Sequence, residues 1–449
     1  MGKKGNLRTQ KPSLLDVWME LLLGCFIVVY LLSIHLPGAG ESAGYSGISE
    51  MKTILFYVLA GILLVYGLIR FGVEALEAKR RNRRLRGLTA SQLAALAFLL
   101  FTLLSAACSP YPEQAWYSKS AHEAALTVSL YVLLFLIVSR WGKPTVRLWR
   151  VFLCAMGLFC LLCAVQALGG NPFTLYPKGM TYYDGYDVRY KGAYAGTIGN
   201  VDLVSAFFAL GIPLILLPAL GRKLRQGWPC WLLTLCCVGL LIWLRVLCGI
   251  VGLAAGAAIS VLVLCPSGKR RWVLLAYGLL GAAALFVLWR FDFSLKSLHE
   301  LHELLHGRAD DTFGTGRFYI WRQMLERIPD RLWLGVGPDA ARFSKLSPFV
   351  RYDEAGTVVA RATITDAHCY PLHILYCQGL PALLSWLTAV GLSLTHWVRR
   401  RAERSIAALG SGLACFLCAM LFCFSSVIIM PFFWLTMGLL EAASQKQDG

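Results

Sequence analysis

Long apolar runs limit the folds open to this chain more than any other feature of its sequence. A membrane-spanning helix needs about 20 mainly apolar residues, and runs that meet or nearly meet this length recur along the chain. The run at 229–265 is interrupted only by Arg245 and its neighbours, so it is one broken helix or two short ones. The run at 405–440 is split around Ser425 and Ser426. We predict helices at 14–36, 53–71, 91–108, 123–139, 148–168, 201–218, 229–244, 247–265, 272–289, 371–396, 405–423 and 425–440.

The composition points to the same class of protein. Of the 449 residues, 57% are hydrophobic and only 15% are charged, whereas soluble domains carry about 25% charged residues. Such a chain cannot hide its apolar surface in a soluble core, so lipid must be part of its solvent. Most of the fifteen cysteines lie within apolar runs, where they act as small apolar residues. We predict an all-α integral membrane protein with about 12 transmembrane helices, the first retained rather than cleaved as a signal peptide.

The distribution of lysine and arginine predicts how the helices are oriented. Alternate connecting segments hold 26 of the 43 basic residues, and such an excess marks the cytoplasmic side. Both termini are therefore expected in the cytoplasm. The formal net charge of +18 is explained by these basic segments lying beside anionic lipid, so we predict membrane lipid as a partner and no nucleic acid.

The chain divides into three regions. Residues 1–289 hold the first nine predicted transmembrane helices, with outer loops at 109–122 and 169–200. Residues 290–370 form a large extracytoplasmic loop, and residues 371–449 hold the last three helices and a cytoplasmic tail. The large loop carries eleven basic and eleven acidic residues. It should contain short amphipathic helices that lie on the outer membrane surface.

Cations in two outer segments are candidates for binding an anion. Arg189 and Lys191 lie in a loop rich in Gly and Tyr, just before a predicted membrane helix. A helix N-terminus beside a Gly-rich turn suits an anion, and a solvated loop with snorkelling cations is the alternative. Arg245 lies between two apolar runs. A charged residue at membrane depth is a functional candidate, and a tight outer turn at the interface is the alternative.

The segment LKSLHELHELLH (295–306) contains a formal HExxH match. His302 and His306 are one helical turn apart and can bind zinc with Glu303 as the base, which would make the protein a membrane zinc protease. No third ligand stands out downstream, and an amphipathic interfacial helix explains the segment better. We therefore assign no metal site and no cofactor.

The large outer loop holds the main candidates for catalysis and substrate binding. Arg317 opens a predicted helix that contains Trp321, and His368 lies at the outer mouth of the helix predicted at 371–396. A histidine in contact with water titrates near neutral pH and is a candidate general base. Asp366 lies two residues earlier and would orient it. A histidine that merely lies at the interface is the alternative.

Short motifs with these residues follow one another in a specific order. They are GNPF (170–173), GTIGNVD (196–202), HGRADDTFGTGRFYIW (306–321), GVGPD (335–339) and DAH (366–368) followed by QGLPALL (378–384). In this order they resemble the O-antigen ligase and polymerase family of bacterial membrane glycosyltransferases. The resemblance covers most of the chain and is most specific from 306 to 385.

The resemblance implies a bundle like that of C-type glycosyltransferases in a bacterial cell membrane. Such enzymes transfer a glycan from a polyprenyl-pyrophosphate carrier to an acceptor hydroxyl on the outer face without a metal. The acceptor would be a glycan or a lipid. Carried over to this sequence, Arg317 and either Arg189 or Lys191 would hold the pyrophosphate, and His368 would be the base.

The residues that follow His368 depart from the family pattern, and the sequence also allows a different function. Family members often continue from the histidine with Asn-Glu-Tyr-Leu, whereas here Cys369, Tyr370, Pro371 and Leu372 follow. The rival is a transporter of lipid-linked or small solutes, which should carry charges at mid-membrane depth and internal repeats. The sequence has few charges within its apolar runs and no repeat. Whether the enzyme ligates or polymerises glycans is left open.

Overall fold

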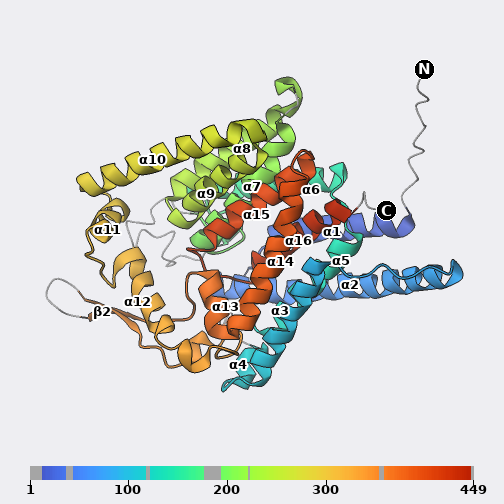
Figure 1. The fold of residues 1–449 in the computed structure, drawn as a ribbon, viewed down its shortest axis with the longest axis horizontal. Coiled ribbons are helices and arrows are strands. Elements are labelled where there is room, and N and C mark those ends of the chain that lie inside the picture. Colours follow the sequence, from blue (N-terminus) through green and yellow to red (C-terminus); the bar gives the residue numbers. More distant parts are fainter. Residues whose placement is uncertain are drawn as a thin grey trace.

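The computed structural model describes residues 13–36, 44–117, 122–175, 194–220, 223–352 and 358–445. In these residues the protein is a bundle of α-helices (Figure 1). Eight helices are long and apolar enough to cross a membrane. They are α1 (Leu14–Leu32), α2 (Gly44–Arg80), α3 (Ala90–Ala107), α6 (Val146–Ala167), α7 (Val201–Ala219), α8 (Leu224–Leu244), α9 (Leu247–Leu264) and α10 (Arg270–Arg290).

The all-α architecture is confirmed, but the count of about twelve transmembrane helices is not. Two more apolar helices are shorter, α5 (Ala125–Trp141) and α15 (Arg404–Ala419). The run predicted at 371–396 is divided at Gly379 into α13 (Tyr370–Gln378) and α14 (Leu380–Arg399), and α16 (Met430–Ser444) is the last helix. Arg245 and Val246 separate α8 from α9, so the interrupted run at 229–265 forms two helices. Every predicted run thus falls on a helix.

Polar residues at helix starts explain several boundaries. Ser13 and Thr89 each accept a hydrogen bond from the backbone of the first turn, and the third helical residue, Asp16 or Gln92, reaches back to the cap. Such a capping box satisfies two otherwise unpaired backbone donors. The Asn200 side chain accepts hydrogen bonds from the first turn of α7. The helices therefore begin where an apolar run meets a short polar side chain.

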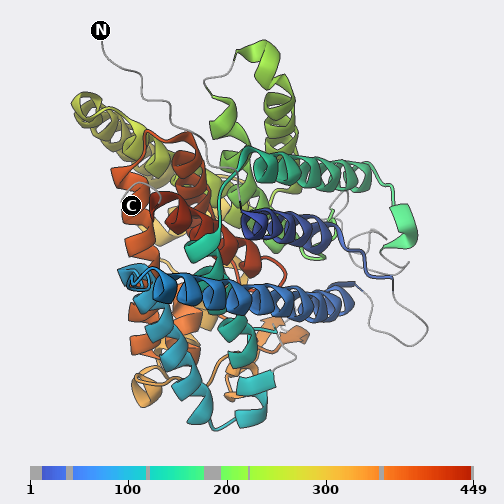
Figure 2. The same cartoon turned by 90° about the vertical axis from the view of Figure 1, so that its right-hand side faces the viewer.

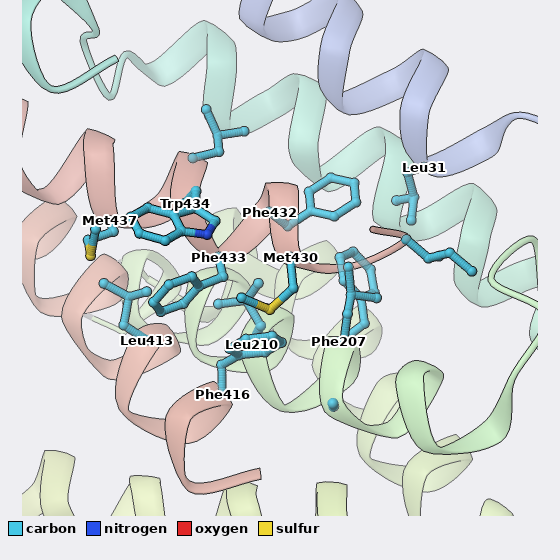
Figure 3. Close-up of a cluster of buried hydrophobic side chains, with 14 of the residues drawn as sticks. Leu31, Phe207, Leu210, Leu413, Phe416, Met430, Phe432, Phe433, Trp434 and Met437 are labelled. Atoms are coloured by element: carbon cyan, nitrogen blue, oxygen red, sulfur yellow. The ribbon is translucent and has the colours of Figure 1, made fainter. Parts of the chain in front are cut away.

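The centre of the bundle is built around α16. Each of its fifteen residues is buried, so this helix is surrounded by protein on all sides. Figure 3 shows its aromatic side chains packed between α7 and α15; the labelled residues include Phe207, Leu210, Leu413, Phe416, Phe432, Phe433 and Trp434. Helix α15 packs against α7 and α9, α16 packs against α5, and α1 lies between α2 and α6 (Figure 2). Close packing of this kind replaces contacts with lipid tails.

Ion pairs join the helix ends on the side that the basic segments mark as cytoplasmic. Asp16 of α1 pairs with Arg70 of α2 at 3.3 Å and with Lys143 at 2.6 Å. Glu74 of α2 pairs with Arg140 of α5 at 2.5 Å. Some of the basic residues that predict orientation therefore also tie α1, α2 and α5 together.

At the opposite end of α1, a buried lysine holds the end of the helix. The Lys52 ammonium donates to the Tyr30 and Leu31 carbonyls, and it lies over the Tyr30 ring. The Thr197 hydroxyl also donates to Leu31. The last carbonyls of a helix have no partner within it, so a buried cation satisfies them. Lys52 itself lies inside α2.

The region between α10 and α13, which was predicted as an outer loop and which we call the outer region, is a packed unit rather than an extended loop. It contains α11 (Lys296–Leu305), α12 (Phe313–Leu325), short 3-10 turns and a hairpin of β1 (Phe349–Tyr352) and β2 (Val358–Ala362). The two helices agree with the predicted short helices, whereas the hairpin was not predicted. The region gathers at one side of the bundle, opposite the C-terminal end of α2 (Figure 1).

A small core of its own holds this outer region together. Buried Ile320 and Met324 of α12 and Ile364 pack against Tyr376 and Cys377 of α13. Ala367, the neighbour of His368, belongs to the same core and is fully buried. The remaining short elements are α4 (Pro112–Tyr117), η1 (Pro172–Thr174), η3 (Ser267–Lys269), η4 (Pro329–Arg331) and η5 (Ala341–Phe343).

Candidate active site

His368 lies in a tight turn immediately before α13. Its backbone has a φ of 45°, in the left-handed region that a non-glycine residue rarely adopts without a compensating contact. The Asp366 carboxylate accepts a hydrogen bond from the His368 N–H at 2.8 Å and lies 3.5 Å from the ring Nδ1. The side chain of His368 is 30% exposed. Asp366 thus holds the backbone and faces one ring nitrogen, as expected of an orienting residue.

Trp321 of α12 fixes the same turn from the other side. Its indole Nε1 donates a hydrogen bond to the Ala367 carbonyl at 2.8 Å, and its ring stacks on Phe318. Trp321 was a candidate for substrate binding, and these contacts give it a role in holding the turn that carries His368. The partner of a partly buried indole N–H is usually a fixed polar group, which is the case here.

Arg317 begins the regular part of α12 after a left-handed turn. Gly314, Thr315 and Gly316 all have positive φ angles. The Arg317 Nη1 donates to the Gly314 carbonyl at 2.7 Å and to the Thr315 hydroxyl at 2.8 Å, and its Nε has no partner. Among the described residues, Arg317 forms no ion pair. A guanidinium held only by neutral groups at a helix N-terminus is suited to an incoming anion.

Residues 420–429 join α15 to α16, and we call them the α15–α16 segment. This segment contacts both Arg317 and His368. The Phe422 carbonyl accepts a hydrogen bond from the Arg317 Nη2 at 3.2 Å. The Phe424 ring packs edge-on against the His368 ring, with centroids 5.5 Å apart. The Tyr370 N–H donates to the Met420 carbonyl at 2.9 Å. The two main candidates from the outer region thus meet a third, distant part of the chain.

Asp202 is a further candidate that the sequence-based list of site residues omits. It lies in the first turn of α7 and is close enough to His368, Arg317 and Asp366 for their charges to act on its carboxyl group. The motif GTIGNVD ends at Asp202, so the signal was present in the sequence. Nothing in the motif alone indicates that α7 would bring this carboxyl group to the outer region.

A comparison with known protein families identifies part of the chain. Residues 231–387 match the O-antigen ligase family model. We refer to this range as the O-antigen ligase segment. It contains Arg317, Trp321, Asp366 and His368, and the predicted resemblance is confirmed over it. A search of curated proteins found no match.

Arg245 lies within the O-antigen ligase segment but apart from the contacts described above. It ends α8 with a φ of 56°, and its N–H donates to the Ile242 carbonyl at 3.2 Å. Its side chain is exposed. This geometry is that of a residue in a tight turn between two helices. Arg189 and Lys191, the other predicted anion-binding cations, lie outside the described residues.

The HExxH pair is also part of the O-antigen ligase segment. The ring centroids of His302 in α11 and of His306, the residue that follows the helix, are 4.3 Å apart. Their Nδ1 atoms face the carbonyls of Leu288 and His302 at 2.7 and 2.8 Å. Within the described ranges, no group of three His, Cys, Asp or Glu residues is arranged to hold a metal ion.

The GVGPD motif of the O-antigen ligase segment serves to dock the outer region onto α13. The N–H groups of Val336 and Gly337 donate to the Tyr376 and Cys377 carbonyls at 3.1 and 2.8 Å. Gly335 has a φ of 63°, and a Cβ there would lie 2.4 Å from the Cys377 carbonyl. Only glycine fits both the backbone angle and the close approach.

We expect Gly335→Ala to lower stability by about 2 kcal/mol or more, because it combines a left-handed backbone with a steric overlap. The midpoint of thermal unfolding in detergent measures the effect. Gly391→Ala in α14 is the matched control, since a Cβ at that position has no atom within 4 Å. Equal midpoints for the two variants would contradict the docking role.

Proposed function

We propose that this protein transfers a glycan from a polyprenyl-pyrophosphate donor to an acceptor hydroxyl on the outer face of a bacterial cell membrane. The family match implies an enzyme that acts on lipid-linked glycans. The observation that carries the proposal is the meeting of Arg317 and His368 at the α15–α16 segment. A cation beside a candidate base is the arrangement that pyrophosphate departure and hydroxyl activation require.

In this mechanism Arg317 binds the pyrophosphate. Its guanidinium exchanges contacts with neutral carbonyls for bidentate contacts with phosphate oxygens, which are stronger because both partners are charged. Negative charge grows on the pyrophosphate as its bond to the sugar breaks. A fixed donor that stabilises this charge contributes about 3 kcal/mol. Arg189 or Lys191 would supply a second cation.

His368 accepts the proton of the acceptor. The Asp366 carboxylate beside Nδ1 favours the tautomer that carries its proton on Nδ1, which leaves Nε2 free to act as the base. The acceptor oxygen attacks the anomeric carbon, the bond to the pyrophosphate breaks, and the hydroxyl proton passes to Nε2. Asp202 then stabilises the imidazolium by its charge. These steps use no metal, and they apply equally to a ligase and a polymerase.

Deleting the gene and profiling surface glycans tests this function. Loss of a surface polysaccharide, with accumulation of its polyprenyl-linked precursor, is expected. Restoration by the wild-type gene but not by a His368→Ala gene would tie the defect to the site. An unchanged glycan profile, or accumulation of the precursor on the cytoplasmic side only, would favour another function such as transport.

The mechanism also requires the outer region to face away from the cytoplasm, which cysteine labelling can measure. In a Cys-depleted background, Ser347→Cys should react with an impermeant maleimide in intact cells, because Ser347 is exposed. Arg84→Cys, exposed after α2 on the predicted cytoplasmic side, should react only after permeabilisation. The reverse pattern would place the site on the wrong face. The fifteen free cysteines of the wild-type chain make the depleted background necessary.

A further inference from the structure

An apolar cavity of about 250 Å³ lies within the helical bundle, lined by side chains of α1, α6, α7, α15 and α16. On α7 the lining extends from Phe207 to Pro218, which is roughly 16 Å of helix. On α16 it forms a single stripe with helical spacing, made of Phe432, Leu435, Thr436 and Leu439. The cavity is therefore a long slot that runs along α7 and α16, and we call it the apolar slot.

One end of the apolar slot lies where two basic connecting segments approach each other. Arg404 at the start of α15 lines this end, together with Thr145 and Val146 at the start of α6. Both helices begin on the side that the basic segments mark as cytoplasmic. Arg404 is exposed and Val146 is 57% exposed, so the slot is open here. Its inner end reaches the core of the bundle, where Phe207 and Phe432 pack with ring centroids 5.0 Å apart (Figure 3).

A polar cavity of about 330 Å³ adjoins the open end of the apolar slot. The two cavities share Thr145 and Val146 in their linings. The charged side chains of the polar cavity are two acids and two bases, namely Asp16, Glu20, Lys143 and Arg147. An apolar slot that ends in a charged cavity has the polarity of an amphiphile, with room for an apolar chain at one end and a charged headgroup at the other.

Two of these four charges are already paired and two are not. Asp16 and Lys143 form an ion pair at 2.6 Å. Glu20 accepts a hydrogen bond from the neutral Thr145 hydroxyl at 2.7 Å. Within the described ranges neither Glu20 nor Arg147 forms an ion pair, with each other or with another residue. A ligand that carries both a cation and an anion can satisfy the two of them together.

We propose that the two cavities bind one phospholipid with an amine headgroup, taken from the leaflet that faces the cytoplasm. One acyl chain fills the apolar slot, the phosphate contacts Arg147 and the ammonium contacts Glu20. An empty apolar void leaves its lining without contacts on one side, and hydrocarbon chains are what the bilayer offers to fill it. Because lipid tails are all about as apolar as the slot, the headgroup decides which lipid binds.

This site is separate from the one proposed for the pyrophosphate. Arg404 begins α15, whereas Arg317 contacts Phe422, just beyond the other end of the same helix. The 16 residues of α15 rise about 24 Å. The phospholipid headgroup and the pyrophosphate of the donor are therefore held at opposite ends of α15. The inference stands whether or not the protein transfers glycans.

Native mass spectrometry of the purified full-length protein tests the site. Dioleoyl phospholipids with ethanolamine, choline and glycerol headgroups are added to delipidated protein at equal concentrations. The ethanolamine lipid should be retained at least about threefold more than either of the others, because it alone offers N–H groups to Glu20. Choline keeps the positive charge without an N–H group, and glycerol carries no cation. Equal retention of the three lipids would overturn the proposal.

Two charge-removing variants assign the headgroup contacts. Glu20→Gln should bring retention of the three lipids to within about twofold of one another, and Arg147→Gln should lower retention of all three by about threefold. Glu77→Gln and Arg150→Gln are the matched controls, since both side chains are exposed near the same end of the bundle and line neither cavity. They should leave retention unchanged. A preference for ethanolamine that survives Glu20→Gln would reject this site.

A third variant tests the apolar slot itself. Ala408 of α15 lines the slot and is 3% exposed, so Ala408→Phe places an aromatic ring in the space of the acyl chain. Retention of every lipid should fall by about threefold or more, and the thermal midpoint shows whether the variant is folded. Unchanged retention in a folded Ala408→Phe protein would place the lipid elsewhere. A copurified polyprenyl lipid that this variant expels would assign the slot to the donor and likewise overturn the proposal.

Discussion

Replacing His368 with alanine should reduce glycan transfer by about 100-fold to 10,000-fold, the usual contribution of a general base. The loss should appear in kcat, while donor binding and thermal stability stay close to wild type. The side chain of His368 is partly exposed and its Nδ1 has no hydrogen-bond partner, so its removal costs little packing. Single-turnover rates with a purified polyprenyl-linked glycan measure this loss.

The controls for His368 come from its own neighbours and from the HExxH pair. Asp366→Asn keeps the size of the orienting group but loses its charge, so it should cost less than His368→Ala. The double variant His302→Ala/His306→Ala should remain active, and EDTA should have no effect. The zinc mechanism would replace the proposed one if His368→Ala is active, the His302→Ala/His306→Ala variant is inactive and EDTA abolishes the wild-type activity.

Both Arg317→Ala and Arg317→Lys should reduce transfer by about 100-fold or more, equivalent to about 3 kcal/mol of lost stabilisation. Lysine keeps the charge but lacks the planar pair of donors that grips two phosphate oxygens. Removal of the guanidinium also frees the Phe422 carbonyl, so the fold of each variant should be checked by gel filtration. Donor binding and kcat are both measured, because a loss confined to kcat indicates that contact strengthens in the transition state.

Arg308→Ala is the matched control for Arg317, since Arg308 lies in the same outer region and forms an exposed ion pair with Glu303 at 2.8 Å. It should change transfer by less than about threefold, as expected for a surface pair. Full activity in Arg317→Lys would show that a diffuse positive charge is enough. Arg189→Ala and Lys191→Ala are compared in parallel, and loss of donor binding in one of them identifies the second cation.

The helices could be predicted from sequence because the residues within each apolar run are enough to make it helical. An apolar run of about 20 residues has to satisfy its own backbone in lipid, and a helix is the solution that needs no distant partner. Every predicted run accordingly falls on a helix. The division at Gly379 is a detail that the run at 371–396 did not reveal, because it depends on the approach of the Trp333 carbonyl to this glycine.

The candidate residues were likewise found from short motifs, but their contacts were not. The order of motifs singled out Arg317, Asp366 and His368, and the turn at Asp366 joins residues adjacent in sequence. The hydrogen bond from Arg317 to Phe422 spans 105 positions, and that from Glu123 to Asp339 spans 216. No periodicity or spacing encodes such pairs, since they depend on how the helices pack.

By itself, the sequence determined that this protein is a helical membrane protein and which outer residues are candidates for its chemistry, because apolar run length and charge act locally. Tertiary structure alone decided that the α15–α16 segment meets Arg317 and His368 and that Asp202 faces them. The physical reason is burial. A carboxyl group acquires an unusual proton affinity only from its surroundings, and those surroundings are assembled from helices far apart in the chain.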